Sequence, residues 1–148
     1  MNVVIKEMTI EDYVEVRALW QESDGVVLSK VDTKKDIARF LERNPGLSFI
    51  ARDGDQLVGA VLCGHDGRYG YIDQLAVCKS YRRQGIGRSL VARCLYNLMR
   101  IGIHKWHLFV FDDNQDAIAF WKKLGWAERV EMITMSHHES RPTDNQGQ

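Results

Sequence analysis

A glycine-rich run, Arg82-Arg83-Gln84-Gly85-Ile86-Gly87, has the residue types and spacing to bind a phosphate or pyrophosphate group. It follows an apolar, strand-like stretch from Tyr71 to Val77 and opens a long amphipathic segment with helical periodicity. Glycines let a ligand approach the backbone closely, and a helix N-terminus presents unpaired N–H groups and about half a positive charge. A strand, a glycine-rich turn and a helix in this order therefore predict an anion-binding site.

The charges around this run favour an anionic ligand. From Gln74 to Phe111 the chain has no Asp or Glu, whereas its basic residues there are Lys79, Arg82, Arg83, Arg88, Arg93, Arg100 and Lys105. A basic, solvated helix face is the alternative explanation. The net charge of the whole chain is zero, which gives no general reason to expect nucleic acid as a partner.

Two polar side chains precede the glycine-rich run on the same stretch. Asp73 interrupts an otherwise apolar strand, where a carboxylate is costly unless it is hydrogen-bonded or faces a cleft. We expect it to act as a general base, with a structural ion pair as the alternative. Tyr71 lies on the same face by the two-residue alternation of a strand, where it is a candidate acid, a pocket wall or a packing residue. Tyr81 is expected to pack.

The elements that must position these residues follow from periodicity and turn chemistry. Thr9, with Asp12 three residues on, is expected to cap a helix that runs to about Ser23, and Asp32 is expected to cap a second helix through about Arg43. Two more helices are predicted, from the glycine-rich turn to about Ile101 and from Gln115 to Leu124. Strands are predicted over Val3 to Met8, Leu47 to Arg52, Gln56 to Cys63, Tyr69 to Cys78, Lys105 to Phe111 and Trp126 to Ser136. The long helical crossover implies one parallel, right-handed strand pair. We therefore expect an α+β fold of three layers, with a mixed, mainly antiparallel central sheet and helices on both faces.

Length and composition bound the remaining possibilities. The 148 residues suit one domain, expected over 1–136, followed by a polar tail at 137–148 that we expect to be disordered. No apolar run reaches membrane-spanning length, so no membrane association is expected. Cys63, Cys78 and Cys94 read as reduced core thiols of a cytoplasmic protein. His104 and His107 lack a third ligand, so no metal site is expected.

Together these residues resemble a GNAT superfamily N-acetyltransferase. The family signature Gln/Arg-x-x-Gly-x-Gly/Ala is matched by Arg82, Gly85 and Gly87. Leu75-Ala76-Val77 matches the strand that carries the cofactor arm. Asn114 and the run from Ala119 to Trp126 match the closing helix and strand of the family. The resemblance covers nearly the whole chain in order and is strongest from Tyr71 to Trp126.

The resemblance implies acetyl-coenzyme A as co-substrate and transfer of its acetyl group to a primary amine. The attack would be direct, in a ternary complex. The amides of Arg83, Gln84, Gly85, Ile86, Gly87 and Arg88 would hold the pyrophosphate, and Leu75, Ala76 and Val77 would pair with the pantetheine like an added strand. The Leu75 amide would polarise the thioester carbonyl, as an oxyanion hole does. Asn114 would reach the cofactor arm from the far side.

The chain departs from the family pattern at two positions. Trp121 stands where many members have a Tyr that protonates the leaving thiolate, and an indole N–H cannot supply a proton at neutral pH. Trp121 is expected to pack against or hydrogen-bond the sulfur, or to be a core residue. Phe109 stands near the place of a Glu found in members that acetylate protein N-termini, which argues against that subclass.

The acceptor wall and the competing functions stay open at this level. By the resemblance, Trp20, Ser23, Asp24 and Ser29 would line the acceptor site, between the first two helices. The acceptor would be a small-molecule or peptide amine, and a homodimer is compatible with the resemblance. An acyl-coenzyme A sensor with little or no catalysis is the alternative function, motivated by Trp121. Another kind of nucleotide binding is weaker, because Leu90 occupies the third glycine of Gly-x-Gly-x-x-Gly.

Overall fold

The structure, a computed structural model, describes residues 2–139, and its centre is an open five-stranded sheet in the order β1-β2-β3-β4-β5. The strands are β1 (Val3–Glu7), β2 (Phe49–Asp53), β3 (Gln56–His65), β4 (Gly70–Val77) and β5 (Trp106–His107). The first four pair antiparallel with their neighbours, whereas β5 runs parallel to β4. This mixed sheet confirms the predicted α+β class.

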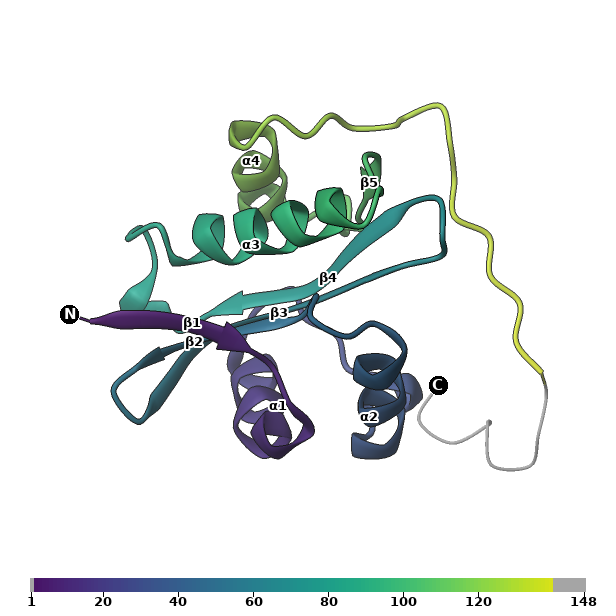
Figure 1. The fold of residues 1–148 in the computed structure, drawn as a ribbon. Coiled ribbons are helices and arrows are strands. Elements are labelled where there is room, and N and C mark those ends of the chain that lie inside the picture. Colours follow the sequence, from purple (N-terminus) through teal and green to yellow (C-terminus); the bar gives the residue numbers. More distant parts are fainter. Residues whose placement is uncertain (1, 140–148) are drawn as a thin grey trace.

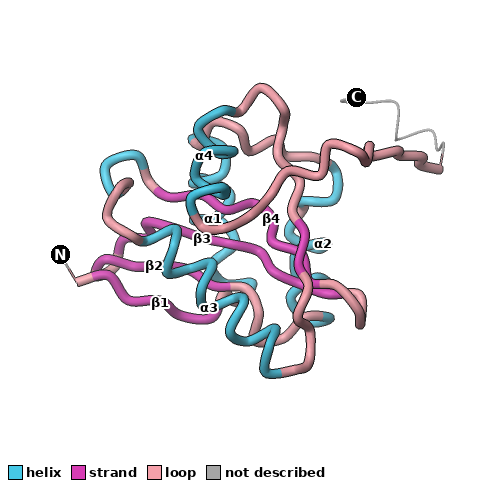
Figure 2. Tube along the Cα trace, turned by 90° about the horizontal axis from the view of Figure 1, so that it is seen from above, coloured by secondary structure: helices cyan, strands magenta, loops and turns pink. Residues whose placement is uncertain are grey.

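Helices cover both faces of the sheet (Figure 1). On one face lie α3 (Ile86–Arg100) and α4 (Gln115–Lys123), and on the other lie α1 (Tyr13–Glu22) and α2 (Lys34–Arg43). Viewed from above, α3 runs across the central strands (Figure 2). Short 3₁₀ turns, η1 (Ile10–Asp12), η2 (Lys30–Asp32) and η3 (Lys79–Tyr81), lead into α1, α2 and the glycine-rich turn. Among residues 2–139, no helix is both long and apolar enough to cross a membrane.

Alternation along the strands builds two apolar layers. In β2, Phe49 and Ala51 belong to the layer beneath α3, and Ile50 belongs to the layer over α1. The helices meet these layers with side chains spaced three or four residues apart. From α3 these are Ile86, Leu90, Cys94 and Leu98, and from α1 they are Tyr13, Val16, Leu19 and Trp20. The sheet therefore holds α1 and α3 at fixed positions on either side of β4.

Local sequence explains most of the helix boundaries. The backbone N–H of Thr9 donates to the Asp12 carboxylate over 2.9 Å, as the predicted capping pattern requires. The second helix corrects the expectation for Asp32, because Thr33 is the residue that caps α2 and its hydroxyl accepts from Asp36 N at 3.2 Å. Asp32 instead ends η2, where its buried carboxylate accepts from Ser29 N at 2.9 Å.

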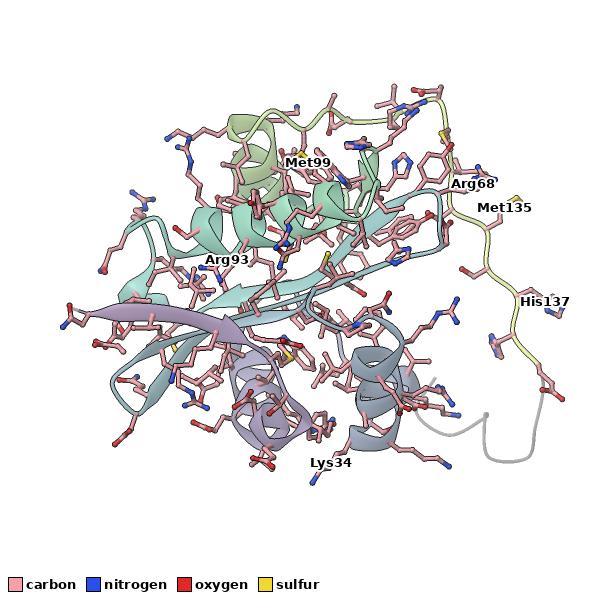
Figure 3. All side chains as sticks on the ribbon, viewed as in Figure 1. Lys34, Arg68, Arg93, Met99, Met135 and His137 are labelled. Atoms are coloured by element: carbon pink, nitrogen blue, oxygen red, sulfur yellow. The ribbon has the colours of Figure 1, made fainter. Side chains whose placement is uncertain are left out.

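The last two predicted strands differ from the structure. The strand expected over Lys105 to Phe111 is confined to Trp106–His107, and the chain from Trp126 to Ser136 forms no strand at all. Figure 3 shows Met135 and His137 on an extended segment that runs clear of the sheet. Strand formation depends on a partner edge, and adjacent apolar residues such as Met132 and Ile133 do not define a single buried face. The expected tail at 137–148 lies mostly outside the described residues.

Candidate active site

The glycine-rich turn has the backbone of an anion-binding site. Arg83 and Gly85 both have positive φ, at 64° and 83°, and they turn successive amides before α3 begins at Ile86. Ser89 N donates to Gly85 O over 3.0 Å. The amides ahead of Ser89 therefore have no carbonyl one helical turn earlier to accept from them. Together with the helix dipole, they fit a pyrophosphate group.

The two glycines of this turn serve different purposes. Gly85 is favoured by its backbone conformation, because its φ is positive. Space is not the reason, since a Cβ there would meet nothing within 4 Å. Gly87 is closely packed: a Cβ there would lie 3.3 Å from the ring of Phe120 on α4, so the ring would have to shift by a few tenths of an ångström. Arg82 folds back, and its Nε donates to Val77 O over 3.1 Å. The turn is thus fixed against both α4 and the end of β4.

One edge of β4 diverges from its neighbour close to this turn. Among the described residues β5 pairs only with Gly70 and Tyr71, at the start of β4. Within residues 2–139, the rest of β4, towards Val77, therefore has no strand paired with it on that side. A free strand edge that leads to a helix N-terminus fits an extended ligand arm ending in a phosphate.

A β-bulge lies in the part of β4 that pairs with β3 but not with β5. Ala76 pairs with Ala60 and Asp73 with Leu62, so β4 has one extra residue between these pairs. Gln74 and Leu75 are the two residues of the bulge, and the φ of Gln74 is 50°. The bulge reverses the facing of the strand: Ile72 belongs to the apolar layer beneath α3, whereas Ala76 belongs to the layer over α1. A bulge of this kind takes the backbone groups of Gln74 and Leu75 out of the regular ladder to β3.

Asp73 lies immediately before the bulge. Its side chain is exposed, yet protein surrounds it closely enough that burial raises the pKa of its carboxyl, as does the charge of Asp32. The Gln74 N–H donates to it over 2.9 Å, which opposes the rise in pKa. A carboxylate with a raised pKa is a better proton acceptor than an ordinary aspartate.

The four residues expected along the acceptor wall have different surroundings. Trp20 is fully buried, so it cannot line a solvent-filled pocket as expected, and its indole N–H donates to Gln74 O over 3.1 Å. The Ser23 hydroxyl donates to Leu19 O at the end of α1. Ser29 caps η2, and Asp24 is exposed in the loop after α1. Asp24 and Ser29 therefore stay available to an acceptor.

The residues expected on the far side of the cofactor arm lie on α4. Asn114 caps this helix, and its Oδ1 accepts from Ala117 N at 3.1 Å. Trp121 is half-buried, and its ring lies edge-on to Phe120 and Trp126, with centroids 5.1 and 5.3 Å away. Trp121 thus packs against its neighbours, as one of the two expected roles requires.

On β4, the ring of Tyr71 lies 6.1 Å from that of His107. Tyr81 packs against the apolar layer beneath α3, as expected, and its hydroxyl donates to Asp53 at 2.7 Å.

Sequence reasoning missed Gln74 and Asp32 as parts of this site. The Gln74 side-chain amide donates to Asp32 Oδ1 over 3.3 Å, although the two residues lie on β4 and in η2. The signal available in the sequence was the polar pair Asp73-Gln74 inside an apolar strand. Nothing in the sequence connected that pair with Asp32, which reads as a helix cap.

The described residues hold other features away from β4. A groove of about 460 Å³ lies between β1 and α3 and is lined by Val3, Ile5, Ser89, Ala92, Arg93 and Tyr96. Its Arg93 guanidinium lies 5.5 Å from the centre of the Phe49 ring, and Figure 3 shows Arg93 on the side of α3 above β1. Among residues 2–139, no three His, Cys, Asp or Glu side chains form a group that could hold a metal ion. The candidate site is therefore defined by the β4 edge and the turn, not by this groove.

A bulged central strand whose free edge leads to the N-terminus of a following helix defines an acyl-coenzyme A transferase fold. Comparison with known proteins agrees with this class. The model of the acetyltransferase (GNAT) family matches residues 13–126. The chain is 34% identical to an acetyltransferase of Pectobacterium atrosepticum over 125 residues, which is 84% of this chain and 87% of that protein.

Solved structures show the same fold at lower sequence identity. The PaiA N-acetyltransferase of Thermoplasma acidophilum, in complex with coenzyme A, superposes with a TM-score of 0.70 at 18% identity, covering 84% of this chain and 89% of that one. An aminoglycoside acetyltransferase from an uncultured soil metagenomic sample, in complex with sisomicin, superposes with a TM-score of 0.73 at 17% identity, covering 94% and 97%. The chain belongs to the GNAT family and is an acetyl-coenzyme A-dependent acyltransferase.

Proposed function

We propose that the enzyme transfers an acetyl group from acetyl-coenzyme A to a primary amine by direct attack in a ternary complex. The observation that carries this proposal is the bulge at Gln74 and Leu75, on an unpaired strand edge that leads to the amides of the glycine-rich turn. The pyrophosphate would sit on the amides from Arg83 to Arg88. The pantetheine arm would follow the β4 edge from Val77 to Leu75, which places the thioester at the bulge.

The chemistry needs an electrophile, a base and a route for one proton. The Leu75 N–H would donate to the thioester carbonyl oxygen, which becomes negative as the amine attacks. The nitrogen–carbon bond forms and the carbon–sulfur bond breaks. Asp73 would accept the proton that the amine loses, directly or through one water molecule. The leaving thiolate would take a proton from solvent or from Tyr71, because Trp121 has none to give.

The acceptor would enter from the side of α1 and the loop that follows it. Asp73 and Asp24 are acidic groups on that side, and they would attract an ammonium group before it loses its proton. The sisomicin-bound neighbour supports an amine acceptor for this fold. Small-molecule and peptide amines both remain candidates. Cys63, Cys78 and Cys94 are free cysteines, which fits a cytoplasmic location, and a homodimer stays an expectation from the family.

Thiol release from acetyl-coenzyme A over a panel of amines and peptides tests the proposal. Acceptor-dependent release that Gly85→Asp abolishes and Asp73→Asn slows supports both the transfer and the assigned base. Cofactor binding that Gly85→Asp destroys, with no release for any acceptor, supports the sensor alternative instead. A stable acetylated enzyme formed without acceptor would contradict direct attack.

A further inference from the structure

The bulge residue Gln74 is held from two directions by groups that are distant in the sequence. The indole N–H of Trp20, on α1, donates to the backbone carbonyl of Gln74 over 3.1 Å. The side-chain amide of Gln74 donates to Asp32, at the end of η2, over 3.3 Å. Both the backbone and the side chain of one bulge residue are therefore anchored to the helices on the same face of the sheet.

This part of β4 has little else to fix its geometry. A bulge interrupts the hydrogen-bond ladder to β3, and β5 has already diverged from the strand. In addition, Gln74 has a φ of 50°, a backbone conformation that residues other than glycine rarely adopt and that the surroundings must stabilise. The two anchoring hydrogen bonds supply such surroundings.

The anchors are themselves rigid. Trp20 is fully buried in the apolar layer over α1, so its indole has no freedom to reorient. Tyr13, seven residues earlier on the same face of α1, donates to the backbone carbonyl of Asp32 at 2.6 Å. Arg17 in turn donates to the Tyr13 hydroxyl at 3.0 Å. Groups locked by their own partners hold a functional geometry better than free ones.

Peptide geometry turns the anchor at Gln74 into a constraint on Leu75. The carbonyl of Gln74 and the N–H of Leu75 belong to one planar trans peptide group, in which the two bonds point in opposite directions. Because Trp20 draws the carbonyl toward α1, the Leu75 N–H points away from α1. A hydrogen bond accepted by a carbonyl also polarises its peptide group and makes the N–H a stronger donor.

We infer that Trp20, Gln74 and Asp32 are positioning residues that aim and polarise the Leu75 N–H for the thioester carbonyl. This inference rests on the proposed function, in which that N–H is the donor. None of the three residues needs to touch the substrate. Trp20 thereby takes a different role from the acceptor wall expected for it, and the indole acts through the peptide group that it holds.

The carbonyl stretching frequency of bound acetyl-coenzyme A, labelled with ¹³C at the acetyl carbonyl, reads the strength of this donor directly. Infrared difference spectra without acceptor would be compared for the full-length wild type, Trp20→Phe and Gln74→Met. Trp106→Phe is the matched control, because the Trp106 indole also donates to a backbone carbonyl, that of Ile103 at 3.1 Å, away from the bulge.

We expect binding to lower the carbonyl frequency in the wild type and in Trp106→Phe. In Trp20→Phe at least half of this lowering should be lost. In Gln74→Met the carbonyl frequency should also be lowered less than in the wild type. Loss of one neutral hydrogen bond would slow kcat by about 3- to 10-fold with little change in KM for acetyl-coenzyme A. If the Trp20 variant fails to fold, Gln74→Met, which leaves the core intact, decides the question.

Two different results would overturn two different statements. A folded Trp20→Phe or Gln74→Met variant that binds acetyl-coenzyme A with the wild-type carbonyl frequency overturns the positioning role alone. A wild type whose bound carbonyl has the frequency of free acetyl-coenzyme A overturns the role of Leu75 in the proposed function, and the positioning role with it.

Discussion

Gly25, in the loop after α1, lies directly against the side-chain amide of Asn114, the residue that caps α4. A Cβ on Gly25 would overlap Asn114 Nδ2, so the two residues fit only because one of them is glycine. Gly25 also has a φ of 83°. This contact joins the loop after α1, on the proposed acceptor side of the sheet, to the start of α4, on the proposed cofactor side. The two halves of the site are therefore mechanically connected, although the residues that connect them are distant in the sequence.

We expect Gly25→Ala to lower the free energy of unfolding by about 2 kcal/mol, from backbone strain and the displaced Asn114 cap. Asn114→Ala alone should cost about 1 kcal/mol. Because the shorter side chain of Asn114→Ala leaves room for the new Cβ, the double variant should lose about 0.5–1 kcal/mol less than the sum. Urea denaturation measures all three. Gly67→Ala, at a positive-φ glycine with open space around it, isolates the backbone cost, and additive effects would contradict the contact.

If the turn binds the pyrophosphate as proposed, Gly85→Ala should weaken coenzyme A binding by about 10-fold, since it disturbs one backbone donor to that group. Its Cβ meets nothing in the structure, so the effect arises from φ alone. Gly54→Ala is the matched control, because Gly54 also has a positive φ and open surroundings, but it lies in the hairpin between β2 and β3. Both variants should lose about 1 kcal/mol of stability. Equal coenzyme A affinities by calorimetry would argue against the assigned anion site.

Asp73→Asn should lower kcat by about 10²-fold if Asp73 is the general base. Because burial raises the pKa of the Asp73 carboxyl, wild-type activity should fall on acidification at a higher pH than an ordinary aspartate would produce. The variant should lose this limb of the pH–rate profile. A profile identical to that of the wild type would assign the base elsewhere.

The same substitution has an expected effect on stability. The pKa of Asp73 is higher in the folded protein than in the unfolded chain, so the ionised carboxylate opposes folding. The protonated carboxyl stabilises the fold fully only below the pKa of the unfolded chain, and this stabilisation is lost as pH rises through the pKa of the folded protein. Asp73→Asn should therefore raise Tm at neutral pH and have no effect near pH 3. Asp66→Asn is the control of opposite sign, because N–H groups of Tyr69 and Arg68 lower the pKa of Asp66. Thermal unfolding across this pH range distinguishes the two.

Arg52→Met should cost about 1–2 kcal/mol at neutral pH, since the guanidinium joins β2 to the start of α1 through charge-assisted bonds. It lies 3.0 Å from Asp12 and 2.9 Å from Glu15. Arg52 lowers the pKa of Glu15, so this part of the stabilisation is lost as pH falls through that lowered value, and the cost should shrink below pH 4.

Arg39→Met is the corresponding surface control. Its pair with Asp36 is 2.8 Å long, but the Arg39 side chain is 73% exposed. We expect a cost of about 0.5 kcal/mol or less for this variant. Equal losses for the two arginine variants in urea denaturation at pH 7 would show that the partly buried network around Arg52 adds nothing beyond a surface pair.

Much of the fold could be predicted because its signals are local. The glycine at position 85, the capping box at Thr9 and the alternation of Phe49, Ile50 and Ala51 each act within a few residues. The conformation of the chain from Trp126 to Ser136 could not be predicted in this way. A strand exists only where another edge accepts its hydrogen bonds, and in the described residues Val130 and Ile133 stay 84% and 82% exposed.

Residue types and their spacing were sufficient to establish the fold family, the anion-binding turn and the polar interruption at Asp73, because each of these signals is contained in a short stretch of chain. The position of the bulge in β4 and the groups that hold it depend on tertiary structure. The reversal of facing between Ile72 and Ala76 requires a known pairing with β3, and no alternation pattern contains it. The contact of Trp20 with Gln74 joins residues 54 positions apart, and only the packing of α1 on the sheet brings them within hydrogen-bond distance.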